Sequence, residues 1–216
     1  MSHSLNEIEA MSKRAARGAG LSWGLAEEAA KGTRWLSSFG FPGVEMLAAL
    51  LQLNDRIPEV DVAPVSLRAD IWHAPARRMS PLIAGAALSD CAVQLRDRGS
   101  ITLESVSLPL LAVPFMGGAA LRLGQPVAVT WSGVRLATNG RQLCVQGSSE
   151  DLQTDQADRL VFTAPAEMTG HREALMRAEP SEDSWQVLAD FAHRTFAPAT
   201  EESRLRGAGA GLSDND

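Results

Sequence analysis

Residues 134–146 read V-R-L-A-T-N-G-R-Q-L-C-V-Q, and this stretch decides the fold class of the chain. Apolar and polar residues alternate on both sides of Asn139-Gly140, as they do in strands that bury one face. The Asn-Gly dipeptide is typical of a two-residue type I′ turn, which requires a positive φ at both central residues. The sequence therefore predicts an antiparallel hairpin. Its expected pairs are Thr138 with Arg141, Leu136 with Leu143 and Val134 with Val145.

This register gives the hairpin one apolar face and one polar face. The polar face carries Arg135, Gln142, Cys144 and Gln146. Residues 127–131 and 160–163 are expected to flank the hairpin as further strands. The apolar run 106–115 contains Pro109 and Pro114. Because proline is confined to sheet edges and bulges, we expect an edge or bulged strand in this run.

One strand and one helix are expected before residue 101. Leu67, Ala69 and Ile71 alternate with polar neighbours and with Trp72, which is the pattern of a half-buried strand. Ser80 followed by Pro81 is typical of a helix N-cap and its first residue. This helix is predicted to run from residue 81 to about residue 97, with Gly99 as its end.

Helices are predicted at both ends of the chain. Ser4 and Glu7 form a capping box, in which each side chain satisfies a backbone amide at a helix start. Two more helices are expected near 22–39, capped by Ser22, and over 44–53. After residue 165, Ser181 opens a helix expected to bury Trp185, Leu188, Phe191 and Ala192.

The fold class that follows is α+β. We expect residues 1–216 to form a single domain with three segments. Residues 1–57 supply N-terminal helices, and residues 58–165 supply a central, largely antiparallel sheet with the hairpin at 134–145 and the helix near 81–97. Residues 166–216 supply C-terminal helices and an ordered glycine-rich tail.

Composition limits the classes of function. A net charge of −6 argues against a protein that binds nucleic acid through excess Lys and Arg. A helix-turn-helix reading of the first two helices meets the same objection, because residues 1–57 carry six basic and six acidic side chains. The chain has two cysteines and lacks an apolar run long enough to span a membrane. We therefore expect a soluble, cytoplasmic protein with no membrane partner.

The most unusual segment is the tail, which reads S-R-L-R-G-A-G-A-G-L-S-D-N-D over residues 203–216. Alternating glycines let backbone amides approach an anion, and arginines bind carboxylate or phosphate. The pattern is neither the dinucleotide-binding fingerprint nor a P-loop, and a flexible glycine-rich end is the plain alternative. The candidate ligand-binding residues are Arg17, Arg204, Arg206, Gly207, Gly209 and Gly211.

Two further candidates are weaker. Residues 105–149 contain no Asp or Glu, so a sheet face with Arg135 and Gln142 could accept an anionic ligand or an acidic partner, although a buried sheet also excludes charge. Asp190 and His193 are an i, i+3 pair on one helix face, which suits a surface ion pair better than a metal site. The sequence assigns no catalytic residue, cofactor or metal ligand.

Two stretches resemble an uncharacterised bacterial family of unknown function. They are 5–10 running into 15–20 and 23–29, and 194–204 with the Gly-Ala-Gly-Ala-Gly end. The resemblance extends over the whole chain and implies no activity or cofactor. It does imply that the tail belongs to the domain.

The leading functional hypothesis is binding of a small anionic molecule, with or without catalysis, where the tail meets the N-terminal helices. The alternative is a non-catalytic interaction subunit or homodimer, in which the tail and the apolar run 108–115 dock a partner. DNA binding by a helix-turn-helix is a third and weaker reading.

Overall fold

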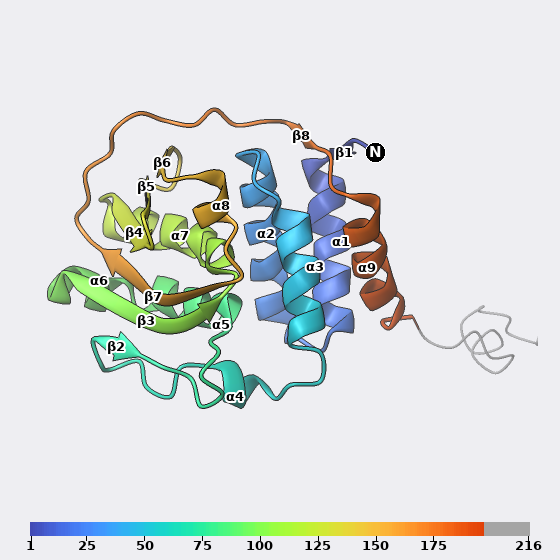
Figure 1. Ribbon diagram of the computed structural model, residues 1–216, viewed down its shortest axis with the longest axis horizontal. Helices are drawn as coiled ribbons and strands as arrows, with labels where there is room; N and C mark the ends of the chain where they lie inside the picture. Colours follow the sequence, from blue (N-terminus) through green and yellow to red (C-terminus); the bar gives the residue numbers. More distant parts are fainter. Residues whose placement is uncertain (197–216) are drawn as a thin grey trace, which may run out of the picture.

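A computed structural model describes residues 1–196 of the chain, and it has the α+β architecture expected from the sequence. Four helices stand side by side as a bundle, and a six-stranded sheet lies on the other side of the molecule (Figure 1). The bundle consists of α1 (Leu5–Gly18), α2 (Trp23–Ser38), α3 (Gly43–Leu53) and α9 (Glu182–His193). One hydrophobic cluster extends from Ile8 in α1 to Phe162 in the sheet and Phe191 in α9.

The caps read from the sequence begin the bundle helices. Ser4 and Glu7 form the expected capping box of α1, and hydrogen bonds from Ser4 hold the pKa of Glu7 below its ordinary value. Ser22 and Ser181 accept hydrogen bonds from the first turns of α2 and α9. These predictions are confirmed. They could be made from the sequence because a cap depends on residues that lie within three positions of one another.

Helix α9 packs very closely against α1. At Gly18 an added Cβ would lie 1.7 Å from the carbonyl oxygen of Phe191. The backbones approach this closely only because glycine has no side chain. A second long-range contact joins the N-terminal residues to the segment before α9, where β1 (His3–Ser4) pairs antiparallel with β8 (Arg177–Ala178).

The sheet has the strand order β2-β3-β7-β4-β5-β6. Its strands are β2 (Ile71–Trp72), β3 (Ser100–Ser107), β4 (Val127–Trp131), β5 (Val134–Thr138), β6 (Leu143–Gln146) and β7 (Gln156–Thr163). Every pair is antiparallel except β2 with β3. The sheet is therefore largely antiparallel, as expected. The hairpin is flanked by β4, whereas β7 lies one strand further in, between β4 and β3.

The hairpin exists, but its predicted register is wrong by two residues. Thr138 pairs with Leu143 and Leu136 with Val145, which leaves residues 139–142 as the loop. The Oδ1 atom of Asn139 accepts hydrogen bonds from the amides of Arg141 and Gln142. Only Gly140 of the Asn-Gly pair has a positive φ, 89°, so the turn is not type I′.

A row of apolar side chains crosses the sheet on one face. Ile101, Phe162, Val129 and Leu136 follow one another across β3, β7, β4 and β5, and each is fully buried. Helices α5 (Pro81–Asp90), α6 (Ala92–Arg98) and α7 (Val113–Leu123) contact these strands. They separate the sheet from the bundle, because α5 and α7 also contact α2.

Two predictions made between residues 67 and 115 are wrong. The strand near residue 70 is only Ile71–Trp72, and Trp72 is buried while Ile71 is exposed, the reverse of the expected alternation. The run 106–115 is not an edge strand, because β3 ends at Ser107 and is followed by the 3-10 helix η1 (Pro109–Ala112) and by α7. Pro109 and Pro114 stand in the first turns of η1 and α7, where proline costs no hydrogen bond. The single helix expected over 81–97 is present as two consecutive helices, α5 and α6, which are interrupted at Cys91, and Gly99 ends α6 in the left-handed conformation as expected.

On the other face of the sheet, β4, β5 and β6 are covered by residues 164–176, here called the strap. Ala166 and Met168 of the strap pack on Ala128, Ala137 and Cys144, and the Cys144 thiol donates to the carbonyl of Gly170 at 2.6 Å. Cys144 is therefore buried, contrary to its predicted place on an exposed polar face. Two short helices complete the described fold, α4 (Glu59–Val62) and α8 (Ser149–Leu152).

Replacement of Gly18 by alanine is expected to destabilise the fold by about 3 kcal/mol, because α1 and α9 must separate to admit the methyl group. The matched control is Gly24→Ala in α2, where an added Cβ meets nothing within 4 Å. The control should be neutral or stabilising by up to about 1 kcal/mol. Urea unfolding of both variants measures the difference, and equal stabilities would contradict the close contact.

The ion pair between Arg194 and Asp55 joins α9 to the end of α3 and should make stability depend on acid pH. Two hydrogen bonds from Arg194, at 2.6 and 3.2 Å, hold the pKa of Asp55 below its ordinary value of 3.8. The stabilisation is therefore complete above the ordinary pKa and is lost as the pH falls through the lowered one. Urea unfolding at a series of pH values should show Asp55→Asn less stable than the parent chain at neutral pH. The difference should shrink below pH 3.8. A constant difference would contradict this assignment.

Candidate functional site

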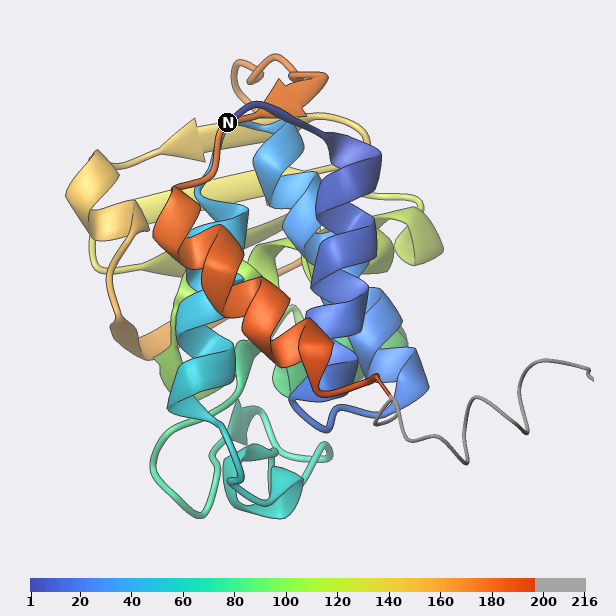
Figure 2. The same cartoon turned by 90° about the vertical axis from the view of Figure 1, so that its right-hand side faces the viewer.

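A small hollow lies at one end of the helical bundle, and we call it the bundle-end pocket. Its volume is about 80 Å³. It is bounded by the turn between α1 and α2, the end of α3, the short helix α4 and the start of α5. Figure 2 shows these segments gathered at the lower end of the bundle. The lining residues are Ala19, Gly20, Leu21, Leu25, Leu50, Leu51, Asn54, Ile57, Glu59, Val62, Ser80, Leu82 and Ile83.

The start of α5 leaves hydrogen-bond donors without acceptors at this pocket. The N-cap serines of α1, α2, α8 and α9 each accept a bond from their own helix, but Ser80 makes no such bond. Ser80 is only 4% exposed. Within residues 1–196, the amides of Leu82 and Ile83 also have no backbone acceptor. A ten-residue helix therefore presents the positive end of its dipole, with free N–H groups, to an enclosed space.

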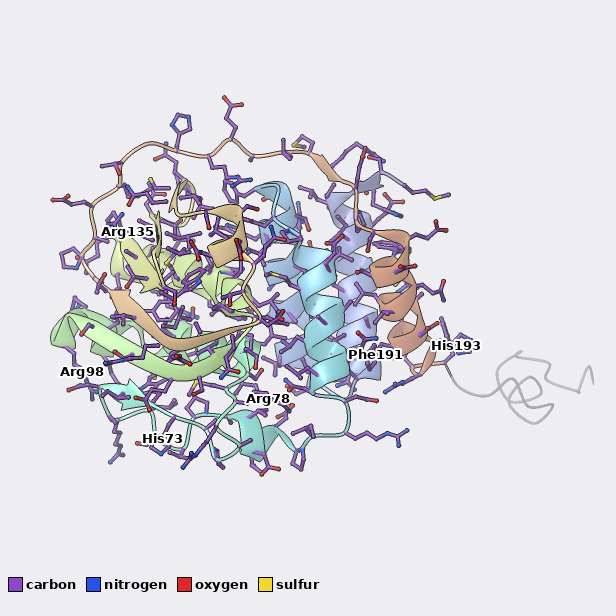
Figure 3. The ribbon with its side chains drawn as sticks, in the orientation of Figure 1. His73, Arg78, Arg98, Arg135, Phe191 and His193 are labelled. Atoms are coloured by element: carbon purple, nitrogen blue, oxygen red, sulfur yellow. The ribbon has the colours of Figure 1, made fainter. Side chains whose placement is uncertain are left out.

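Two more polar atoms beside the pocket lack partners among the described residues. The Oδ1 atom of Asn54 is buried and accepts no hydrogen bond, and the Nε atom of Arg78 is buried and donates none. Arg78 is held near Asn54 because its Nη2 atom donates to the carbonyl of Leu53 at 3.3 Å. Figure 3 shows Arg78 close to the lower end of α3. Buried polar groups in native proteins nearly always have partners, so this concentration of unsatisfied atoms requires an explanation.

The rest of the pocket is apolar apart from one acid. Leucines from α2, α3 and α5 form the wall together with Val62 and Ile57. Glu59, which is exposed, is the charged residue among those that line the pocket within residues 1–196. An apolar enclosure lowers the local dielectric and strengthens any electrostatic contact made inside it.

Of the residues predicted to bind a ligand, Arg17 is the one that the structure describes. Its guanidinium donates to the carbonyl of Leu21 and lies 4.4 Å from the ring centroid of Trp23. Arg17 thus supports the α1–α2 turn that borders the pocket, but it is not among the lining residues. Arg204, Arg206, Gly207, Gly209 and Gly211 lie outside the described residues.

The weaker candidates are corrected by the structure. Arg135 donates to the carbonyl of Glu167 at 2.7 Å, and Figure 3 shows it beside the strap, so the proposed open anion-binding sheet face is partly covered. The apolar run 108–115 is buried rather than exposed for docking, except for the half-buried Pro114. On α9, Asp190 accepts from Gln186 at 2.8 Å, while His193 packs against Phe196.

Helix α2 is the predicted DNA-reading helix, and Cys91 is one of the two cysteines. Helix α2 packs against α1, α3, α5 and α7, so much of its surface is covered. Burial raises the pKa of the Cys91 thiol, which therefore stays protonated at neutral pH. Within residues 1–196, no helix combines the length and apolar character needed to cross a membrane.

A larger but more open groove lies under the strap. It has a volume of about 600 Å³ and lies between residues 40–42, the end of β6 and residues 169–172. Arg172 is already engaged there, since it lies 4.4 Å from the ring centroid of Phe41. Among residues 1–196, the residues that line this groove have no buried side-chain polar atom without a partner, so we do not assign the groove a ligand.

Comparison with known families gives one match. Residues 3–80 match a family described as a protein of unknown function (DUF3726). The predicted resemblance to an uncharacterised family is confirmed for this part of the chain, although it was expected over the whole length. The matched part contains the pocket residues from Ala19 to Ser80. No curated protein matches the chain.

The sequence contained a signal for only one of the newly identified site residues. Ser80 was predicted as the N-cap of α5, but a sequence pattern does not tell whether a cap hydroxyl is used. Asn54 and Arg78 carry no local signal, since their lack of partners follows from contacts between distant segments.

The unused hydroxyl of Ser80 leads to a stability prediction. Ser181→Ala removes a working cap and should cost about 1 kcal/mol. Ser80→Ala removes a hydroxyl that makes no cap bond and should cost less than about 0.5 kcal/mol. Urea unfolding of the two variants checks this, and an equal loss would show that Ser80 has a structural partner.

Proposed function

We propose that the protein binds a small anionic molecule in the bundle-end pocket, with its negative group at the start of α5. The observation that carries the proposal is the coincidence of free amides at Leu82 and Ile83 with the unused hydroxyl of Ser80 in one enclosed space. The N-terminus of a helix favours an anion through both its free N–H groups and its dipole. Whether the bound molecule is also transformed is left to experiment.

Basic side chains near the pocket support this choice of ligand charge. Arg78 has a buried Nε donor without an acceptor among residues 1–196. Arg56 stands between the lining residues Asn54 and Ile57 and has a positive φ of 61°, a backbone conformation that costs energy for a residue with a side chain. Both arginines would attract an anion towards the mouth of the pocket.

Asn54 can adapt to the ligand. A half-turn of its amide exchanges Oδ1 for Nδ2, so the same side chain presents either an acceptor or a donor. The unpartnered position could thus donate to an anionic oxygen. Glu59 opposes an anion at the rim, which makes it useful as a test of charge.

The predicted tail contacts remain part of the proposal. Arg17 supports the α1–α2 turn at the pocket, and α9 runs alongside α1 and ends beside that turn (Figure 2). Arg204, Arg206 and the glycines at 207, 209 and 211 would add donors to the bound anion.

Inorganic phosphate, sulfate and acetate are the probes for a thermal-shift experiment at constant ionic strength, with chloride as the reference. An anion present at ten times its Kd should stabilise the protein by about 1.4 kcal/mol, which raises the Tm by roughly 3 °C. Ser80→Ala and Arg78→Met should reduce the shift, and Glu59→Gln should increase it. Arg204→Ala and truncation after Leu205 should reduce it if the tail contributes.

Ser181→Ala is the matched control, because it removes a serine N-cap far from the pocket and should leave the anion-dependent shift unchanged. Absence of a shift with all three anions would remove the support for an anion site. A shift unaffected by Ser80→Ala and Arg78→Met would place the anion elsewhere. The cytoplasmic location and the bacterial origin expected from the sequence stay predictions.

A further inference from the structure

The apolar lining of the bundle-end pocket restricts the chemical character of the rest of the ligand, beyond its negatively charged group. Apart from the polar group formed by Ser80, Asn54 and the start of α5, and from the exposed Glu59, the lining is aliphatic. Leu50, Leu51 and Leu82 in this wall are each no more than 2% exposed, so they form a fixed surface rather than a mobile rim. An ion with oxygen atoms on every side, such as phosphate, would leave some of its oxygens against these leucines at a cost in desolvation.

The size of the pocket sets a second limit. A volume of about 80 Å³ holds on the order of six water-sized atoms, at roughly 10 to 15 Å³ for each. A carboxylate with a chain of three or four carbon atoms fills this space. A nucleotide or a long acyl chain does not fit within it.

We infer that the bundle-end pocket takes a short-chain aliphatic monocarboxylate, its carboxylate at the α5 N-terminus beside Ser80 and its hydrocarbon chain against the leucines. This inference rests on the proposed anion-binding function and narrows it to one class of ligand. Two carboxylate oxygens match the two free amides of Leu82 and Ile83 and the hydroxyl of the N-cap Ser80. The hydrocarbon chain leaves no polar atom facing the apolar wall.

The affinity of a homologous series of carboxylates tests the inference. Acetate, propionate, butyrate, hexanoate and decanoate are titrated into the full chain by isothermal calorimetry, with inorganic phosphate alongside. Each methylene buried should tighten the Kd roughly fourfold. The gain should continue to about butyrate or hexanoate and then stop, because the pocket is full.

A variant that narrows the pocket should change this dependence on chain length. Ile83→Phe places a larger side chain in the lining and should abolish the gain from acetate to hexanoate while acetate still binds. Val93→Phe is its matched control, because Val93 is 53% exposed on α6 and lies outside the lining. If circular dichroism shows that Ile83→Phe does not fold, Ile57→Phe, at a lining position 39% exposed, serves instead.

The outcomes separate the inference from the proposed function. Carboxylates and phosphate that bind with equal affinity, whatever the chain length, overturn the monocarboxylate inference but leave the anion site in place. A length dependence that Ile83→Phe or Ile57→Phe does not alter places the carboxylate outside this pocket and overturns the inference as well. Failure of every titrant to bind removes both.

Discussion

The packing of one apolar row under three helices determines where the other elements lie. Ile101, Phe162, Val129 and Leu136 stand side by side across four strands because the antiparallel register aligns them. Their burial requires a helical layer on that face, and α5, α6 and α7 form it. Helix α5 packs against both the sheet and α2, so its contacts with the sheet determine the level along the bundle axis at which α5 begins.

The bundle-end pocket is a consequence of that arrangement. Helix α5 begins where the α1–α2 turn and the end of α3 meet, so its first residues line the pocket. Among residues 1–196, the N-cap serines of α1, α2, α8 and α9 each satisfy an amide of their own helix, whereas Ser80 does not. Donors at such a helix start are available to water or to a bound anion.

Features encoded within a few residues were predictable from the sequence, and features set by distant contacts were not. The capping box of Ser4 and the cap of Ser181 depend on neighbours in the chain, so the helices they begin were predicted well. The hairpin was predicted, but the side chain of Asn139 stabilised a longer loop than its Asn-Gly pair suggested. Pro114 indicated a strand edge, yet burial of the surrounding apolar run favoured a helix with proline at its start. Ser80 was recognised as a cap, but its unused hydroxyl and the orphaned Asn54 depend on segments far apart in sequence.

The close contact between Gly18 and Phe191 has a consequence for how the chain is made. Helix α1 leaves the ribosome first, but the helix that covers it is among the last described elements to be synthesised. At roughly 5 to 20 residues per second, translation of the intervening chain takes on the order of ten to thirty seconds. During that interval the apolar face of α1 has no α9 to pack against, which makes the nascent N-terminal helices a natural substrate for chaperones that hold unfinished chains.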